Sequence, residues 1–267
     1  MWRCRGKVWK GGIESEYTHN KTKRKSRFCY SKWRKCCKWL WYYKKICEEF
    51  YQIGVDVITT GNHVWDQREI IQHIETDSRL IRPCNFPENT PGKGFGIYQI
   101  KNGIRIIVIN VMCTLFMESM DNPFASLEKI LEKVGSLSGE YLIVVDVHGE
   151  STSEKMAIGH FLDGKVTSVT GTHTHIPTSD LQIMSNGTFY QTDLGMCGDY
   201  DSVIGMKKEM SLKRFIHKHI KTRLEPADGE GTLCGVILEI DLKTKKVINF
   251  KQILKDGLLD RKNGRTL

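Results

Sequence analysis

Residues 141–175 read YLIVVDVHGESTSEKMAIGHFLDGKVTSVTGTHTH and contain a strand, a helix and a second strand in succession. The first segment, YLIVVDVHGE, is mostly apolar and carries His148 near its end. STSEKMAIGHFL follows with the pattern of a helix capped by Ser151 or Thr152. VTSVTGTHTH is a second strand that ends on His173 and His175. Strands that alternate with helices are typical of a layered α/β protein.

The same alternation continues on both sides of this unit. Strands are predicted over 55–61, 94–100, 104–113, 187–196, 232–242 and 246–254, and helices over 47–54, 65–76, 122–134 and the first part of 207–231. Gly54 is a plausible C-cap of the first helix. No internal repeat or low-complexity tract interrupts the pattern. The chain is therefore predicted to form a layered α/β sandwich.

Residues 1–46 differ sharply in composition from the rest of the chain. They hold 15 Lys and Arg against two acidic residues, together with five of the six tryptophans. The remaining residues hold 25 basic and 29 acidic side chains, so the net charge of +9 comes from this N-terminal segment alone. We therefore divide the chain into an aberrant basic, Trp- and Cys-rich segment, 1–45, and a globular domain, 46–267.

Length and composition limit the class of protein. A chain of 267 residues with 40% hydrophobic content can bury one large α/β core or two small ones. No run of 18 apolar residues predicts a membrane span, and residues 1–20 lack the pattern of a secretory signal. Nine cysteines at irregular spacings indicate a reducing compartment. A cytoplasmic protein is expected.

Polar side chains with metal-ligand chemistry follow three of the predicted strands. Asn62 and His63 follow one strand, His148 another, and His173 and His175 a third. The carboxyl ends of strands in α/β sheets are where sites assemble, and ligands two residues apart on an extended chain point to the same side. Imidazole and amide ligands favour Mn, Fe or Zn over Ca. Each motif alone has an ordinary explanation, a core histidine or a Gly-Asn turn, but together they predict a metal site.

The longer motifs carry a family resemblance. GVDVITTGNHVWDQREI, RLIRPCNFPENTPGKGFGIY, MDNPF, DVHGESTSEKMAIGHFLDGKVTSVTGTHTHIPT and TDLGMCGDYDSVIGM resemble the bacterial 2′,3′-cyclic-nucleotide 2′-phosphodiesterase family of calcineurin-like metallophosphoesterases, over residues 46 to about 250. The resemblance implies an α/β/β/α sandwich. It also implies a phosphodiesterase that uses two divalent metal ions, Fe or Mn, and acts on a cyclic nucleotide or an RNA-derived phosphodiester, with a homo-oligomer possible and no membrane partner.

The resemblance also implies roles for individual residues. Asn62 would bind one metal and face the substrate phosphate, and His63 would be the catalytic general acid that protonates the leaving sugar oxygen. His148 and His173 would complete the second metal site, and His175 would bind the first metal. Two metals about 3.5–4 Å apart would activate a bridging hydroxide. Residues of the pocket or of a structural loop would be Tyr200, Asp201 and Ser202.

The N-terminal segment lacks two motifs of this family. Members begin with a strand ending in GD and continue with a strand ending in NGEN, which supply an aspartate, a glutamate and an asparagine. Trp has the single codon TGG, and a shift of one base turns it into a glycine codon. In the shifted frame MWRCRGKVWK permits CGDVVGKSGR, and residues 32–43 permit NGENAANGFGIT. Residues 1–45 therefore resemble an out-of-frame translation of the family's N-terminus, with the frame restored near Lys44 and Lys45.

This interpretation has consequences for the printed chain. The aspartate would straddle Arg3–Cys4, the glutamate Arg34–Lys35 and the asparagine Lys35–Cys36. The first two strands would be lost or corrupted, so the literal product is expected to fold poorly and to be inactive. The ordinary alternative for the segment is a divergent basic arm.

Two other functions remain open for this segment. Its aromatic and basic side chains suit nucleic-acid binding through stacking and phosphate neutralisation. A zinc site built from Cys29, Cys36 and Cys37 is a weaker alternative, because their spacing matches no common zinc pattern.

Overall fold

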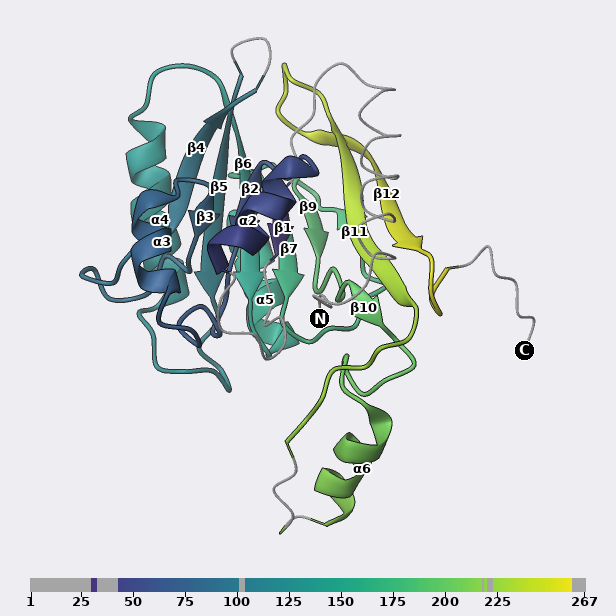
Figure 1. The fold of residues 1–267 in the computed structure, drawn as a ribbon. Coiled ribbons are helices and arrows are strands. Elements are labelled where there is room, and N and C mark those ends of the chain that lie inside the picture. Colours follow the sequence, from purple (N-terminus) through teal and green to yellow (C-terminus); the bar gives the residue numbers. More distant parts are fainter. Residues whose placement is uncertain (1–29, 33–42, 101–103, 218, 220–222, 261–267) are drawn as a thin grey trace.

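The computed structural model describes residues 30–32, 43–100, 104–217, 219 and 223–260. They form stacked layers of helices and sheets (Figure 1). The central layer is a six-stranded sheet in the order β4 (Phe95–Gln99), β5 (Arg105–Met112), β6 (Tyr141–His148), β7 (Ser168–Thr172), β9 (Phe189–Gln191) and β8 (Gln182–Ile183). Strands β5, β6, β7 and β9 are parallel, and the edge strands β4 and β8 are antiparallel to their neighbours. The carboxyl ends of β5, β6 and β7 therefore meet at one edge of the sheet.

Helices α4 (Pro123–Gly135) and α5 (Thr152–Leu162) cover one face of this sheet. Strand β5 alternates strictly, since Ile107, Ile109 and Val111 enter the core beneath the helices while Ile106 and Val108 enter the core on the opposite face. Both helices begin at side-chain caps, because Asn122 Oδ1 accepts from two backbone amides and Ser151 Oγ accepts from the amide of Glu154. Of the two predicted caps of α5, Ser151 and Thr152, the structure has Ser151.

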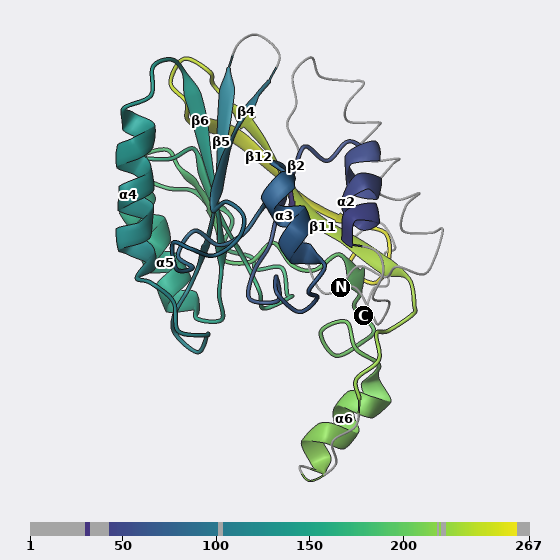
Figure 2. The same cartoon turned by 60° about the vertical axis from the view of Figure 1, so that its left-hand side comes forward.

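A second, smaller sheet packs on the other face. Its strands are β1 (Tyr30–Lys32), β2 (Val57–Thr59) and β3 (Leu80–Ile81), all parallel. Val57 and Ile81 contribute to the buried cluster that also holds Ile106 and Val108 of the large sheet. Helices α2 (Tyr43–Gln52) and α3 (Ile70–Thr76) cover the outer face of the small sheet, as the rotated view in Figure 2 shows. The predicted α/β layered sandwich is therefore confirmed.

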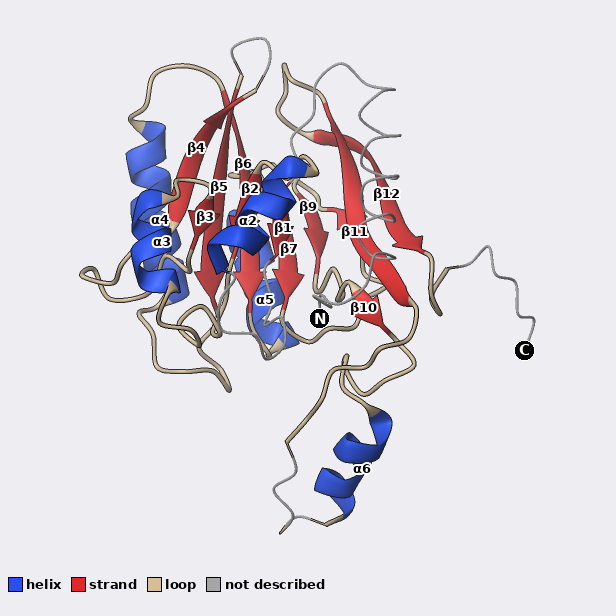
Figure 3. Cartoon of the chain, in the orientation of Figure 1, coloured by secondary structure: helices blue, strands red, loops and turns tan. Residues whose placement is uncertain are grey.

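The remaining elements flank these layers. Strands β10 (Gly198–Asp199), β11 (Gly231–Ile240) and β12 (Val247–Lys255) form an antiparallel sheet. Helix α6 (Lys208–Ile216) extends away from the sheets (Figure 3). No helix among the residues described is long and apolar enough to cross a membrane.

Some local predictions differ from the structure. The helix predicted over 65–76 begins only at Ile70, because turns occupy residues 62–69. The helix predicted over 47–54 begins earlier, at Tyr43, and ends at Gln52, with the predicted cap Gly54 just beyond it. There the amides of Gly54 and Val55 bond back to the helix carbonyls and Gly54 has a φ of 97°.

The predicted loss of the first two strands does not apply to one of them within the described residues. One short strand, β1, is present and pairs with β2 in parallel, so its backbone pairing is retained; such pairing does not depend on particular side chains. The strand expected at the start of the chain lies outside the described residues, as do the positions proposed for the missing carboxylates and the Cys29, Cys36 and Cys37 group.

Candidate functional site

Three of the predicted ligands converge at the carboxyl ends of β2, β6 and β7. Asn62 follows β2, His148 ends β6, and His173 follows β7. Asn62 Oδ1 lies 2.9 Å from His148 Nε2, and His173 Nδ1 lies 3.2 Å from the same nitrogen. The two imidazole rings meet edge to face with their centroids 4.8 Å apart. The predicted assembly of strand-end ligands therefore exists for these three residues.

The tautomer of His148 follows from its second ring nitrogen. Thr172 donates its single hydroxyl proton to Asp146 Oδ1 at 2.9 Å, so the same hydroxyl accepts from His148 Nδ1 at 3.1 Å. Asp146 is fully buried and also accepts from Asn110 Nδ2. With the proton on Nδ1, the lone pair of Nε2 points toward Asn62 and His173. This carboxylate–hydroxyl–imidazole chain is the support that metal-binding histidines usually have.

His173 is oriented in the same sense from the opposite side. Its Nε2 lies 3.1 Å from Glu150 Oε2, and a proton on that nitrogen leaves the Nδ1 lone pair directed at His148. One amide oxygen and two imidazole nitrogens therefore lie close together at the strand ends. Imidazole and amide ligands suit Mn, Fe or Zn. The donor set thus fits a divalent transition-metal ion.

The loop that carries His173 and His175 is left-handed at both residues. Their φ angles are 111° and 72°, and strand β7 already ends at Thr172. The prediction that both rings point to the same side of an extended strand is therefore wrong in its premise, because alternation applies only to extended backbone. Positive φ at non-glycine residues costs energy and persists only where the surroundings impose it.

A buried ion pair stabilises the left-handed backbone at His173 and His175. Lys155 Nζ on α5 lies 3.4 Å from Asp193 Oδ2, and each side chain is only 1% exposed. The same carboxylate oxygen accepts from the amide and hydroxyl of Thr174, between the two histidines, at 2.9 and 2.8 Å. Lys155 also donates to the carbonyl of Thr172. The turn is thus fixed to the protein core on both sides of His173.

His63 and His175 stand apart from the three converging residues. Nδ1 of His175 donates to the carbonyl of Ile204 at 2.9 Å, which leaves the Nε2 lone pair available as a ligand. His63 is half exposed, and its Nδ1 lies 3.3 Å from Asp66 Oδ2. The roles of these two histidines in metal binding and acid catalysis stay predictions. Tyr200 has a structural position, since its hydroxyl lies within hydrogen-bond distance of the carbonyls of His175 and Met196.

Several supporting residues were not predicted from the sequence. They are Asn110, Asp146, Glu150, Lys155, Thr172 and Asp193. One signal was available: a carboxylate in the middle of an apolar strand, two residues before His148 and therefore on the same side of it. No comparable signal marked Thr172 or the partners on α5 and after β9.

Removal of the Thr172 hydroxyl tests the support of His148. Thr172→Val is expected to lower metal affinity about 10–100-fold, the usual effect of losing a partner that orients a ligand. Metal affinity measured by calorimetry checks this. Thr172→Ser keeps the hydroxyl and should bind metal like the unaltered protein; equal losses in both variants would contradict the assigned chain.

Comparison with known proteins identifies the family of this chain. The family model described as YmdB-like protein matches residues 42–253. A 2′,3′-cyclic-nucleotide 2′-phosphodiesterase of Bacillus subtilis is 42% identical over 211 residues, which are 79% of this chain and 78% of that protein. A crystal structure described as a novel phosphatase of Mycoplasma pneumoniae has a TM-score of 0.84 and 31% identity over 99% of this chain and 94% of that one. A hypothetical protein of Thermus thermophilus has a TM-score of 0.83 and 29% identity, over 94% and 96%.

The layered α/β sandwich and its relatives define the class of this protein as a hydrolytic phosphoesterase. The chain belongs to the YmdB-like protein family. The resemblance inferred from the sequence motifs is therefore confirmed, and with it the expectation of an enzyme. The family match begins at residue 42, close to the point where the composition changes.

Proposed function

We propose that this protein hydrolyses 2′,3′-cyclic nucleotides or RNA-derived phosphodiesters with two divalent metal ions, Fe or Mn. The observation that supports this most directly is the convergence of Asn62 Oδ1 and His173 Nδ1 on His148 Nε2, at 2.9 and 3.2 Å. The similarity to the Bacillus subtilis phosphodiesterase supports the substrate class. Metal ions bound there would polarise the phosphoryl oxygens and lower the pKa of a bound water.

The residues of the chain divide the remaining work. Asn62, His148 and His173 would hold one cation, and His175 would contribute to the other. Attack of hydroxide on phosphorus breaks the bond to O2′, and His63 would supply the proton that this oxygen takes up. Asp66 beside Nδ1 would keep the ring of His63 turned so that Nε2 faces the leaving oxygen.

Completion of the first cation site, to which His175 contributes, requires the aspartate and glutamate of the two family motifs that residues 1–45 lack. We propose that residues 1–45 are read one base out of frame and that the in-frame segment supplies the aspartate, glutamate and asparagine. The start of the family match at residue 42 and the confinement of five tryptophans to residues 1–41 support this. The nucleotide sequence of codons 1–50 tests it, together with the mass of the N-terminal peptide.

The function is tested by comparing the printed chain with a frame-restored version. The restored protein is expected to release nucleoside 3′-monophosphate from 2′,3′-cyclic nucleotides when Mn²⁺ or Fe²⁺ is added, and the printed chain is expected to be inactive. Turnover by the printed chain would overturn the frame proposal. Absence of turnover by a folded, metal-loaded, restored protein would overturn the proposed substrate class.

Basic residues in the N-terminal segment keep nucleic-acid binding as a second candidate. Salt-dependent RNA binding that is lost when 1–46 are deleted, without metal-dependent hydrolysis, would favour it.

We also propose a cytoplasmic location. The cysteines described by the structure are all free, which supports this location.

Substitution of His63 tests its proposed role as the general acid. In the frame-restored protein, His63→Gln is expected to lower kcat about 10²–10⁴-fold for a cyclic nucleotide, because an unprotonated alkoxide leaves poorly. An ester with a nitrophenol leaving group needs no such proton, so its hydrolysis should fall far less. Steady-state kinetics with both substrates check this; equal losses would contradict acid catalysis by His63.

A further inference from the structure

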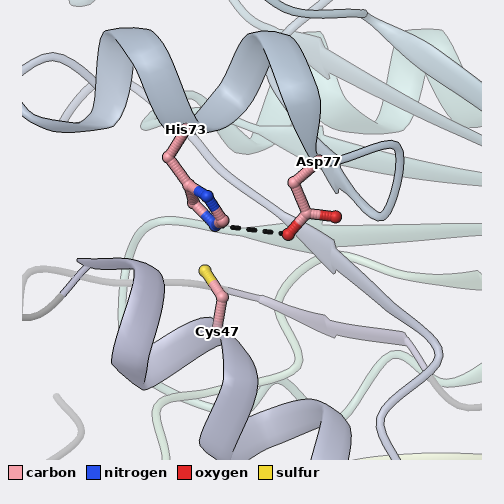
Figure 4. Close-up of side chains that lie close together, drawn as sticks. All are labelled: Cys47, His73 and Asp77. Atoms are coloured by element: carbon pink, nitrogen blue, oxygen red, sulfur yellow. Dashed lines mark ion pairs between the residues drawn. The ribbon is translucent and has the colours of Figure 1, made fainter.

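A second group of potential ligands lies between helices α2 and α3, on the outer side of the small sheet. Cys47 projects from α2, while His73 and Asp77 project from the end of α3 (Figure 4). One ligand atom from each residue lies within 4.8 Å of the other two. The geometry points to a zinc site formed by Cys47, His73 and Asp77, distinct from the histidine–asparagine site at the strand ends.

The separations suit a single small cation. His73 Nε2 and Asp77 Oδ2 are 3.3 Å apart. Two ligands on zinc at bond lengths of about 2.0–2.1 Å and tetrahedral angles lie about 3.3 Å from each other. A thiolate with a bond of about 2.3 Å would lie about 3.6 Å from either ligand. The sulfur of Cys47 is within 4.8 Å in the structure, so only a small side-chain movement is required.

An unsatisfied buried nitrogen is the second observation. Within the described part of the chain, His73 Nε2 is buried and has no hydrogen-bond partner, since its approach to Asp77 lacks hydrogen-bond geometry. A buried polar atom without a partner destabilises the fold, and a cation would remove this penalty. The nitrogen faces the carboxylate and thiol shown together in Figure 4.

The surroundings of Asp77 orient it as a ligand. Tyr51 donates its hydroxyl proton to Asp77 Oδ2 at 2.7 Å, and the amide of Arg79 donates to Oδ1 at 2.9 Å. Such outer contacts fix the carboxylate and are typical of metal sites. The site is enclosed but reachable, because the side chains of His73 and Asp77 are 13% and 11% exposed while Cys47 is fully buried.

The ligand chemistry selects the metal. Thiolate, imidazole and carboxylate together suit Zn²⁺, and a water molecule can complete four-coordination. The strand-end site contains no sulfur, so the two sites differ in spectroscopic signature. The ordinary alternative is a buried cysteine that packs as a small apolar side chain beside a His–Asp pair.

Cobalt substitution in the full-length chain tests the site. Added Co²⁺ is expected to produce the near-ultraviolet sulfur-to-cobalt charge-transfer absorption, at one equivalent per chain, and Zn²⁺ should abolish it by displacement. Cys47→Ala should eliminate the band. Cys113→Ala, at an equally buried cysteine outside the group, should leave it unchanged. Because Cys47, His73 and Asp77 all follow Lys45, the frame-restored chain carries the same three ligands, and the test is made in that chain.

A measurement of thermal stability tests the site independently of the cobalt absorption band. Zn²⁺ at about 100 times its Kd should raise the Tm by about 5–10 °C in the unaltered chain and in a His148→Ala variant, whose strand-end site is disabled. The same increase should be absent in His73→Gln, whose folding is checked by circular dichroism. Absence of the charge-transfer band, its survival in Cys47→Ala, or its loss in Cys113→Ala would each overturn the proposal.

Discussion

The His148→Ala variant of the frame-restored protein is expected to lose at least about 10³-fold in kcat/KM for cyclic-nucleotide hydrolysis. His148 Nε2 is the atom that both Asn62 and His173 approach, at 2.9 and 3.2 Å. Loss of this central ligand removes several kcal/mol of transition-state charge stabilisation supplied by a bound metal, which corresponds to about three decades in rate. Steady-state kinetics at saturating Mn²⁺ measure the effect.

The control for this prediction is a histidine of the same chain outside the site. His160 is exposed on α5, and His160→Ala should retain activity within a factor of about two. Both variants should retain the circular-dichroism spectrum of the unaltered protein. If folded His148→Ala protein kept more than a tenth of the activity, the convergence of ligands at His148 Nε2 would not be required for hydrolysis.

The second large effect concerns stability. Lys155→Met is expected to lower the free energy of unfolding by about 3–5 kcal/mol, because it leaves the charge of Asp193 buried without its cation. Asp193 also holds the amide and hydroxyl of Thr174, so the turn between the two histidines should loosen as well. Urea unfolding should show a lower midpoint with an unchanged slope.

An exposed lysine–aspartate ion pair supplies the matched control. Lys208 and Asp201 are 2.8 Å apart, but their side chains are 49% and 71% exposed. Lys208→Met should therefore change the unfolding free energy by less than about 1 kcal/mol. The double variant Lys155→Met with Asp193→Asn should recover part of the loss, because it removes both buried charges. A loss below about 1 kcal/mol in Lys155→Met alone would show that the pair is not essential to the core.

The parts of the fold that local patterns encode were predictable. The apolar runs of β5 and β6 and the capped helix α5 appear close to their expected positions. His148 was placed correctly because a ligand that ends a buried strand needs no long-range information. The presence of Asn62 and His173 beside it followed from the same rule about strand ends.

Long-range contacts account for what was missed. The sequence THTH reads as extended, but Asp193, which bonds to Thr174 from nineteen residues away in the chain, stabilises a left-handed turn instead. Cys47 and His73 come from different helices, and no spacing rule joins them. Thr172 lies in an ordinary strand, and its role in orienting His148 depends on its hydrogen bond to Asp146 on the neighbouring strand.

The converging ligands do not come from a single sheet. Asn62 follows a strand of the small sheet, whereas His148 and His173 follow strands of the large one. A cation held by all three residues would link the small sheet to the large sheet, in addition to any role in catalysis. Bound metal should then oppose separation of the small sheet from the large one, and the metal-free protein should open first between these two sheets. Amide hydrogen exchange should therefore slow most at the ends of β2 and β6 when metal binds.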